Sequence, residues 1–312
     1  MRVKNLRRLA ARLGAIGGDV VISSENFSFF FEPENVNALA EALRPVFDEI
    51  RIICYLRRQD RHVISHHQEG AKLNRAAEYD LFGHSTLAIP PYREHHRLYL
   101  DYHAKLSMWA DAFGEENLIL RIFDRRLLRN GDVTDDFFHL LGVRNFVRVP
   151  DRNLSSGFQR SKLGHLVLAG GFRHTPGLLN LVASFEESGR KMRPSRAAAE
   201  AYYAHFAESN AALNARFGIS PNPGLFDEDF SDYPEEAEDI WDEERAGETC
   251  MKFLQALDDV YAELSPAFVL RAADLLAGED PALARSLLRM AVRLRPMAGD
   301  IADRLADLEA SD

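Results

Sequence analysis

Short apolar segments alternate with longer amphipathic ones in the first part of the chain. Three short segments are rich in β-branched residues: DVVIS at 19–23, IRIICYL at 50–56 and NLILRIF at 117–123. This composition is typical of strands that a parallel sheet buries on both faces. Between the first two, residues 35–49 carry apolar side chains at helical spacing, which predicts a right-handed crossover from one strand to the next.

Further helices are predicted near 61–74, 93–113, 134–142, 160–169 and 195–217, where apolar positions recur every three or four residues. Helix therefore outnumbers strand. The predicted fold class is α/β, with a parallel sheet flanked by helices.

Residues 218–245 differ from the sequence before them. Two prolines precede the run LFDEDFSDYPEEAEDIWDEE, which is too acidic and too interrupted to begin as a packed helix. We interpret it as an acidic arm or linker whose aromatic residues hold it on the body while its carboxylates stay in water. Those aromatic residues are Phe226, Phe230, Tyr233 and Trp241. A fully solvated acidic surface is the alternative.

The last part of the chain is predicted to be helical at 246–264, 266–277, 281–294 and 298–310. From Ala267 to Leu308, small and large apolar residues alternate in a way that resembles a degenerate tetratricopeptide-type hairpin. One or two such repeats are fewer than an independent solenoid needs, so we expect them to dock on the main domain. The predicted organisation is a domain at 1–225, an arm at 226–245 and a helical extension at 246–312.

The composition fits a globular protein, since 46% of the 312 residues are apolar and 28% are charged. The longest apolar runs have only a few residues, whereas about 20 are needed to cross a bilayer, so no membrane span is expected. The first 18 residues are basic and amphipathic, a pattern that is also found in transit peptides and surface anchors. They lack the apolar core of a secretory signal. We expect a cytoplasmic protein.

The net charge of −10 is unevenly distributed. Residues 1–225 hold 30 Lys and Arg against 25 Asp and Glu, whereas residues 226–312 hold 8 against 23. Nucleic-acid binding needs clustered cations and is disfavoured by this charge balance. Binding of a small anionic ligand by residues 1–225 is still compatible with it. Cys54 and Cys250 are far apart and indicate neither a zinc motif nor a disulfide, so reduced thiols are expected.

The stretch YLRRQDRHVIS at 55–65 is the most informative for chemistry, because an apolar strand ends there in two arginines and gives way to a helix. Arg57 is placed at the carboxyl end of the strand, the edge at which open α/β sheets bind ligands, and Ser65 follows on the helix. A guanidinium offers forked donors to phosphate oxygens, and a hydroxyl adds another hydrogen bond. The alternative is that Arg57 only caps the sheet through an ion pair with Asp60 or Glu25.

This stretch resembles the 3′-phosphate-binding segment of sulfotransferases that use 3′-phosphoadenosine 5′-phosphosulfate (PAPS), in which a strand ends in Leu-Arg and a serine follows eight residues later. Other similar segments are VISSENF at 21–27, LSMWADAFGEENLILRIFDRRLLRNGDVTDDFFHLLGV at 106–143, NLSS at 153–156 and the Leu-Phe to Tyr pattern at 225–233. In order and spacing they resemble bacterial polysaccharide sulfotransferases. The resemblance covers about 19–233 and implies a P-loop-related parallel sheet flanked by helices.

The resemblance also implies roles for individual residues. Arg57 and Ser65 would hold the 3′-phosphate of the donor PAPS, and Asn153 and Ser155 would approach the nucleotide. Glu25 would take the proton from a carbohydrate hydroxyl, a task for which its pKa must rise toward the working pH. A capping carboxylate is the alternative for Glu25, and local side-chain-to-backbone hydrogen bonds are the alternative for the NLSS loop.

The chain departs from this family at its beginning. Such enzymes open with a strand and a short loop of Lys, Gly and Thr or Ser that holds the 5′-phosphosulfate. Residues 1–18 include Lys4 and a Gly17-Gly18 pair but no glycine-rich loop between a strand and a helix. The fold is therefore expected to be N-terminally incomplete, through a misplaced start, a fragment or divergence. Sulfuryl transfer, which depends on positioning and charge stabilisation, is then expected to be impaired.

A metal centre is not expected. His62 and His66 have the spacing of helical metal ligands, but the glutamate of an HExxH motif is absent. Six basic residues nearby are candidates for attracting an anionic saccharide, with a solvated mixed-charge helix face as the alternative. They are Arg58, Arg61, Lys72, Arg75, Arg93 and Arg97.

Two hypotheses follow from the sequence. The first is a sulfotransferase-like protein that moves a sulfuryl group from PAPS to a carbohydrate hydroxyl without a metal. The second is a non-catalytic relative that binds a nucleotide, or that binds a protein partner through its C-terminal helices.

Overall fold

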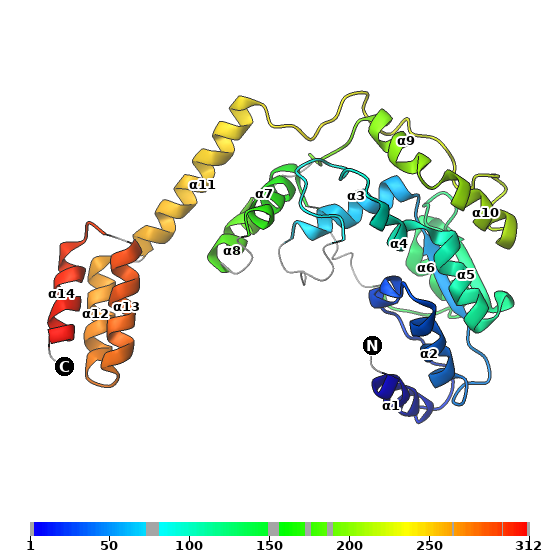
Figure 1. The fold of residues 1–312 in the computed structure, drawn as a ribbon, viewed down its shortest axis with the longest axis horizontal. Helices are drawn as coiled ribbons and strands as arrows, with labels where there is room; N and C mark the ends of the chain where they lie inside the picture. The colour runs from blue at the N-terminus through cyan, green and yellow to red at the C-terminus, as the bar shows by residue number, and fades with distance from the viewer. Residues whose placement is uncertain are drawn as a thin grey trace. The chain divides into compact units, whose positions relative to one another are not determined.

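The computed structural model describes residues 3–72, 81–148, 156–171, 176–185, 190–263, 265–294 and 296–310. The chain divides into two compact units, Met1–Ile240 and Trp241–Asp312 (Figure 1). Most described residues are helical, and the two described strands form one parallel sheet in the first unit. The predicted α/β class and the predominance of helix are confirmed.

The first unit is built from short helices that follow one another closely. Its described α-helices are α1 (Val3–Gly14), α2 (Pro33–Leu43), α3 (Gln59–Gly70), α4 (Arg97–Leu100), α5 (Tyr102–Phe113), α6 (Val133–Leu140), α7 (Phe158–Ala169), α8 (Pro176–Ser184), α9 (Arg196–Ala204) and α10 (Ala207–Phe217). Single 3-10 turns lie between them at η1 (Glu25–Phe29), η3 (Glu94–His96), η4 (Glu115–Asn117) and η5 (Arg129–Gly131).

The sheet consists of β1 (Ile52–Leu56) and β2 (Leu118–Ile122), which pair in parallel. Ile52 lies opposite Leu118 and Leu56 opposite Ile122, so the two strands end at the same edge. The predicted strands at 50–56 and 117–123 are thereby confirmed. The crossover between them runs through α3, α4 and α5, as a parallel connection requires.

Helices cover both faces of the sheet. Successive residues of a strand point to opposite sides, so each strand contributes side chains to both faces. On one face, Cys54 and Leu120 belong to an apolar cluster that α5 completes. On the other face, Asp136 of α6 accepts hydrogen bonds from the Tyr55 hydroxyl (2.8 Å) and from Nη2 of Arg121 (2.7 Å). Figure 1 shows α5 and α6 close to the strands, and this layering leaves the carboxyl ends of the strands at the edge.

The strand predicted at 19–23 is wrong. These residues have no regular structure, and the side chains of Val21 and Ile22 are exposed. A β-branched sequence fits a pleated, half-buried surface but does not create one, and this segment pairs with no described strand. The observed crossover therefore begins at β1 and not before it.

Two predicted helices are interrupted. The one expected at 93–113 breaks at Asp101, whose carboxylate caps the start of α5 by accepting a hydrogen bond from the amide of Ala104 (3.0 Å). The one expected at 195–217 is divided between α9 and α10. Apolar periodicity runs across the second break because α9 and α10 both contribute to one cluster, whereas α4 and α5 bury their apolar residues in different clusters.

The basic N-terminal helix belongs to the core of the first unit. Leu6 and Ala10 of α1 are buried in one apolar cluster with Val36 and Leu39 of α2. The apolar face of α1 is therefore covered by α2, and the residues that suggested a surface anchor contribute to the core of the fold. In the described part of the chain, no helix combines the length and the apolar character that a membrane crossing demands.

The second unit contains α11 (Glu243–Glu263), α12 (Pro266–Ala277), α13 (Pro281–Leu294) and α14 (Gly299–Ala310). The four helices predicted in this part of the chain are confirmed, with boundaries within three residues. α12, α13 and α14 pack against one another around the buried residues Val269, Ala273, Leu288 and Ile301. Small residues at the centre let these helices approach closely.

Histidines are buried between α3 and α7. The ring of His67 stacks on that of His165 with centroids 3.9 Å apart, and the two helices meet so closely that a Cβ at Gly164 would collide with the carbonyl oxygen of Ala71. Neither ring nitrogen of His67 has a hydrogen-bond partner among the described residues. Burial lowers the pKa of His67 well below its ordinary value.

Stability is expected to fall in mild acid. Burial lowers the pKa of His62 to about 3 and that of His96 to about 4, in addition to its effect on His67. Because the unfolded chain takes up these protons near pH 6.5 and the folded state does not, the contribution is complete above that pH and is lost as the pH falls. For His62 and His96 the unfolding free energy should fall by about 2 kcal/mol each between pH 7 and pH 5.

Urea unfolding of the His67→Leu variant at both pH values measures the share of one histidine. The pH-dependent loss should be smaller in the variant than in the parent protein, whatever the variant's absolute stability. His139→Leu is the matched control, because that side chain is exposed. An unchanged pH dependence in His67→Leu would contradict the assignment.

Candidate functional site

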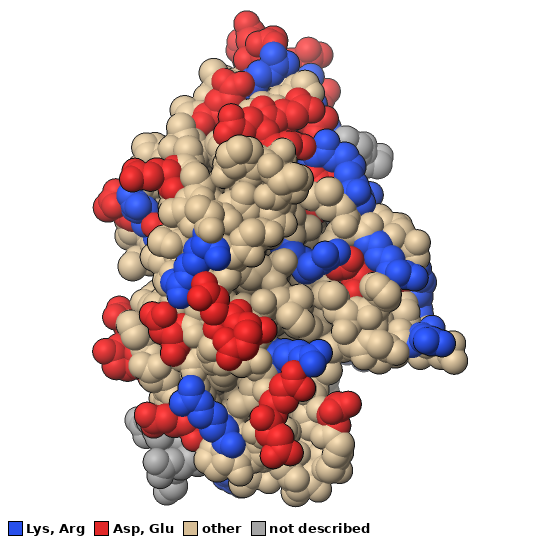
Figure 2. All heavy atoms as spheres, turned by 90° about the vertical axis from the view of Figure 1, so that its right-hand side faces the viewer, with Lys and Arg blue, Asp and Glu red and all other residues tan. Residues whose placement is uncertain are grey.

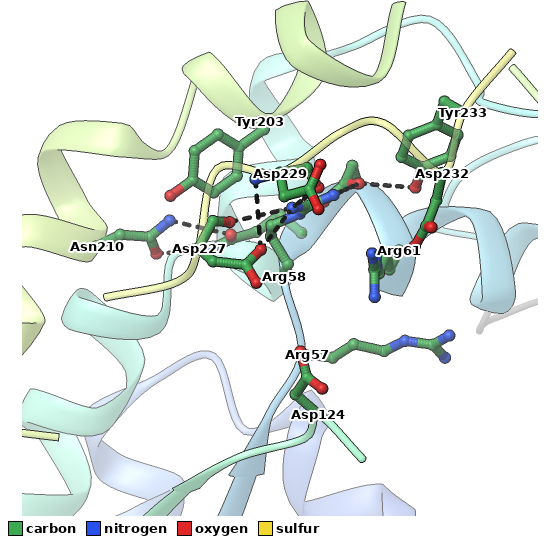
Figure 3. Close-up of polar contacts among 12 residues, drawn as sticks. Arg57, Arg58, Arg61, Asp124, Tyr203, Asn210, Asp227, Asp229, Asp232 and Tyr233 are labelled. Carbon is green, nitrogen blue, oxygen red and sulfur yellow. Dashed lines mark hydrogen bonds and ion pairs between the residues drawn. The ribbon is translucent and has the colours of Figure 1, made fainter. Parts of the chain in front are cut away.

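The candidate site lies at the carboxyl edge of the two strands. Arg57 and Arg58 follow β1, and Phe123 and Asp124 follow β2, so parallel pairing brings the four residues to one edge. α3 starts directly after Arg58. Residues 226–233, the first part of the predicted acidic arm and from here on called the arm, lie across the same edge (Figure 3). Open α/β sheets bind ligands at this kind of edge.

Arg58 joins the sheet edge to α3 and to the arm. Its Nε and Nη2 donate to the two carboxylate oxygens of Asp60 at 2.8 and 3.0 Å, and both side chains are almost completely buried. Its Nη1 donates to the carbonyl oxygens of Asp227 (3.0 Å) and Asp229 (2.7 Å) in the arm. Burial acts to lower the pKa of Arg58, but the hydrogen bond and charge of Asp60 outweigh it and raise that pKa.

Apolar side chains of the arm complete this attachment. Phe226, Phe230 and Tyr233 are buried in the cluster that contains Leu56, and the Tyr233 hydroxyl donates to Asp60 at 2.7 Å. The prediction that aromatic residues hold the acidic segment on the body is confirmed for these three. The fourth, Trp241, belongs to the second unit.

Arg57 differs from its neighbour in having no partner for its charge. Its guanidinium makes no hydrogen bond or ion pair with any residue that the structure describes, and its Cζ lies 5.8 Å from the ring centroid of Phe123. Figure 3 shows it extending away from the carboxylates that hold Arg58. The ion pair with Asp60 or Glu25 that the sequence left open is not formed, because Asp60 is taken by Arg58.

Burial lowers the pKa of Arg57, and the nearby Tyr102, Tyr233 and Asp60 only partly oppose this. The backbone of Arg57 is nevertheless fixed, since its carbonyl oxygen accepts a hydrogen bond from the buried Tyr102 hydroxyl at 2.7 Å. A partly desolvated cation on a fixed backbone is what an anionic ligand would stabilise.

The other predicted site residues are not gathered around Arg57 by any contact that the structure shows. Ser65 is exposed on α3, one turn after Arg61 and on the same helical face. Glu25 is exposed at the start of η1, where Ser24 and not Glu25 provides the cap by accepting from the amide of Asn26. Asn153 and Ser155 lie outside the described residues.

A hollow of about 240 Å³ opens at this edge. It is lined by Arg58, Arg61, Ile122, Phe123, Asp124, Arg126, Leu127, Asn222, Phe226 and Asp227. Arg57 is not part of the lining, but Phe123, over which its guanidinium lies, is. Sequence reasoning missed Arg126 and Asp227, although the FDRR segment after the second strand marked the first of them.

Most of the basic residues proposed to attract an anionic saccharide are already engaged. Arg61 pairs with Asp232 at 2.9 Å, Lys72 with Glu69 at 2.6 Å and Arg97 with Asp101 at 3.2 Å, while Arg75 lies outside the described residues. Arg93 precedes η3. On the face in Figure 2, basic and acidic side chains are interspersed, which fits the mixed-charge alternative.

The histidine pair considered for a metal has another role. Nδ1 of His62 lies 2.6 Å from the Tyr102 hydroxyl, and because that hydroxyl donates to Arg57, the imidazole is the donor. Within the described ranges, no group of three or more His, Cys, Asp or Glu is arranged to hold a metal ion. Burial raises the pKa of Cys54 to about 11, which keeps that thiol protonated.

Comparison with known proteins gives one distant relative and no assignment. No family model matches the chain, and no solved structure matches it. An uncharacterized protein of Archaeoglobus fulgidus is 35% identical over 129 residues, which is 40% of this chain and 30% of the relative. The chain therefore aligns with about a third of that protein's length.

The buried ion pair should dominate the stability of this edge. Replacing Arg58 with Ala leaves the carboxylate of Asp60 buried without a counter-charge, which is expected to cost about 3 to 5 kcal/mol of unfolding free energy. Arg126→Ala is the control, because Arg126 is 60% exposed and exposed ion pairs contribute little to stability. Urea unfolding of both variants tests this, and equal losses would contradict it.

Proposed function

We propose that the carboxyl edge of the β1–β2 sheet binds the 3′-phosphate of PAPS and that the protein is a sulfotransferase-like transferase acting on a carbohydrate hydroxyl. One observation carries the proposal: the guanidinium of Arg57 is partly buried at a strand end and has no counter-ion among the described residues. The proposal includes a P-loop-related fold and a tetratricopeptide-like second unit.

The chemistry of Arg57 suits a phosphate monoester. A guanidinium presents two parallel N–H donors to two phosphate oxygens, and a dianion restores the charge balance that burial disturbs. Ser65 and Arg61, on one face of α3, are the proposed source of further donors. Asn153 and Ser155 remain proposed nucleotide contacts, and Glu25 the proposed base.

Arg57→Ala should weaken binding of adenosine 3′,5′-bisphosphate by about 1.5 to 3 kcal/mol, which is the worth of a hydrogen bond to a charged group. This corresponds to a rise in Kd of roughly ten- to a hundredfold. Calorimetric titration measures it. Arg216→Ala is the control, because Arg216 lies on α10 and pairs with Glu115. Equal affinity of Arg57→Ala and the parent protein would remove Arg57 from the site.

A non-catalytic binding protein is the second candidate, and two observations favour it. Glu25 has no contact with Arg57 in the described part of the chain, and its side chain is exposed at the start of η1. In the second unit, large apolar side chains stay exposed on α12 and α13, as on a surface that meets a protein partner. They are Phe268, Leu275, Leu283 and Met290.

Glu25 separates the two candidates. If the protein transfers a sulfuryl group from PAPS to a carbohydrate, Glu25→Gln should lower turnover about a hundredfold or more while nucleotide affinity stays the same. The measurement is transfer of labelled sulfate, with Glu34→Gln of α2 as the control. Full turnover in Glu25→Gln would exclude it as the base, and no turnover in the parent protein would favour the binding protein.

A further inference from the structure

Asp227 of the arm places its carboxylate against the hollow at the sheet edge. One oxygen lies 3.3 Å from Nη1 of Arg58, and the other forms an ion pair with Nη2 of Arg126. Both arginines and Asp227 itself line the hollow. A carboxylate held between two guanidinium groups occupies the position that two oxygens of a phosphate or sulfate would take.

The hollow is lined by three guanidinium groups and by two carboxylates, those of Asp124 and Asp227. Two of these arginines, Arg58 and Arg61, also pair with Asp60 and Asp232, which are not part of the lining. Asp124 follows β2 directly, and it accepts from Nη2 of Arg126 at 2.6 Å and from the amide of Arg126 at 2.9 Å. Asp227 is therefore the lining carboxylate that the arm brings from a distant part of the chain.

The carboxylate of Asp227 is held more weakly than the backbone that carries it. Asp227 and Arg126 are 36% and 60% exposed, and exposed ion pairs are worth little. In contrast, the carbonyl oxygens of Asp227 and Asp229 bind the buried Arg58, whose own charge is already balanced by Asp60. The side chain of Asp227 can leave by rotation while the arm stays attached.

We propose that Asp227 is a built-in competitor of the anion that binds at this edge, so that the ligand enters by displacing the carboxylate from Arg126 and Arg58. This regulation rests on the proposed function only in that the ligand is an anion. The arm then sets the affinity of the sheet edge for the anion, and any partner that draws Asp227 away raises that affinity.

Inorganic sulfate is the probe, and calorimetric titration of Asp227→Asn is the test. The neutral amide removes the competing charge, so sulfate should bind about three- to tenfold more tightly than to the parent protein. Asp229→Asn is the matched control, since it removes the same charge from the same arm, while its carboxylate accepts from the amide of Ser231 and forms no ion pair within the described ranges. The gain should disappear when Arg126→Ala is added to Asp227→Asn.

Equal sulfate affinity in Asp227→Asn and the parent protein would overturn the proposal. An equal gain in Asp229→Asn would overturn it as well, because net charge would then explain the effect, and so would the absence of sulfate binding to Asp227→Asn at tens of millimolar. Failure of the proposed function is distinguishable, because it appears as equal binding of the bisphosphate nucleotide to the parent protein and to Arg57→Ala.

Discussion

The buried ion pair between Arg58 and Asp60 organises the sheet edge. It joins the end of β1 to the first turn of α3, and the third nitrogen of the same guanidinium binds two carbonyl oxygens of the arm. Burying two charges is costly unless their hydrogen bonds are completed. Here Asp60 also accepts from Tyr233, so the arm supplies part of that completion and is held in return.

In this arrangement the consecutive residues Arg57 and Arg58 have different roles. Side chains that follow one another at a strand end point in different directions, so only one of them can enter the cluster under the arm. Arg58 enters it and becomes structural, whereas Arg57 is left partly desolvated and forms no ion pair with a residue that the structure describes. The candidate ligand site is thus a consequence of how the edge is stabilised.

The same edge explains how binding and the arm are linked. The arm is fixed by its backbone and its buried aromatic rings, while one of its exposed carboxylates reaches the guanidinium groups of the hollow. Within a few residues, the arm thus combines buried contacts that hold it in place with exposed ion pairs that contribute little. The interacting residues all belong to the first unit.

The sequence by itself determined the two paired strands, most of the helices and the position of Arg57 after β1, because these depend on local periodicity and on where an apolar run ends. It did not decide that 19–23 stays outside the sheet, since a strand exists only where a neighbour pairs with it. Nor did it decide which arginine pairs with Asp60, or that Arg126 and Asp227 meet. Arg126 and Asp227 lie 101 positions apart, and Tyr233, which completes the hydrogen bonds of Asp60, lies 173 positions from it, so only the packing of the arm on the sheet edge brings these residues together.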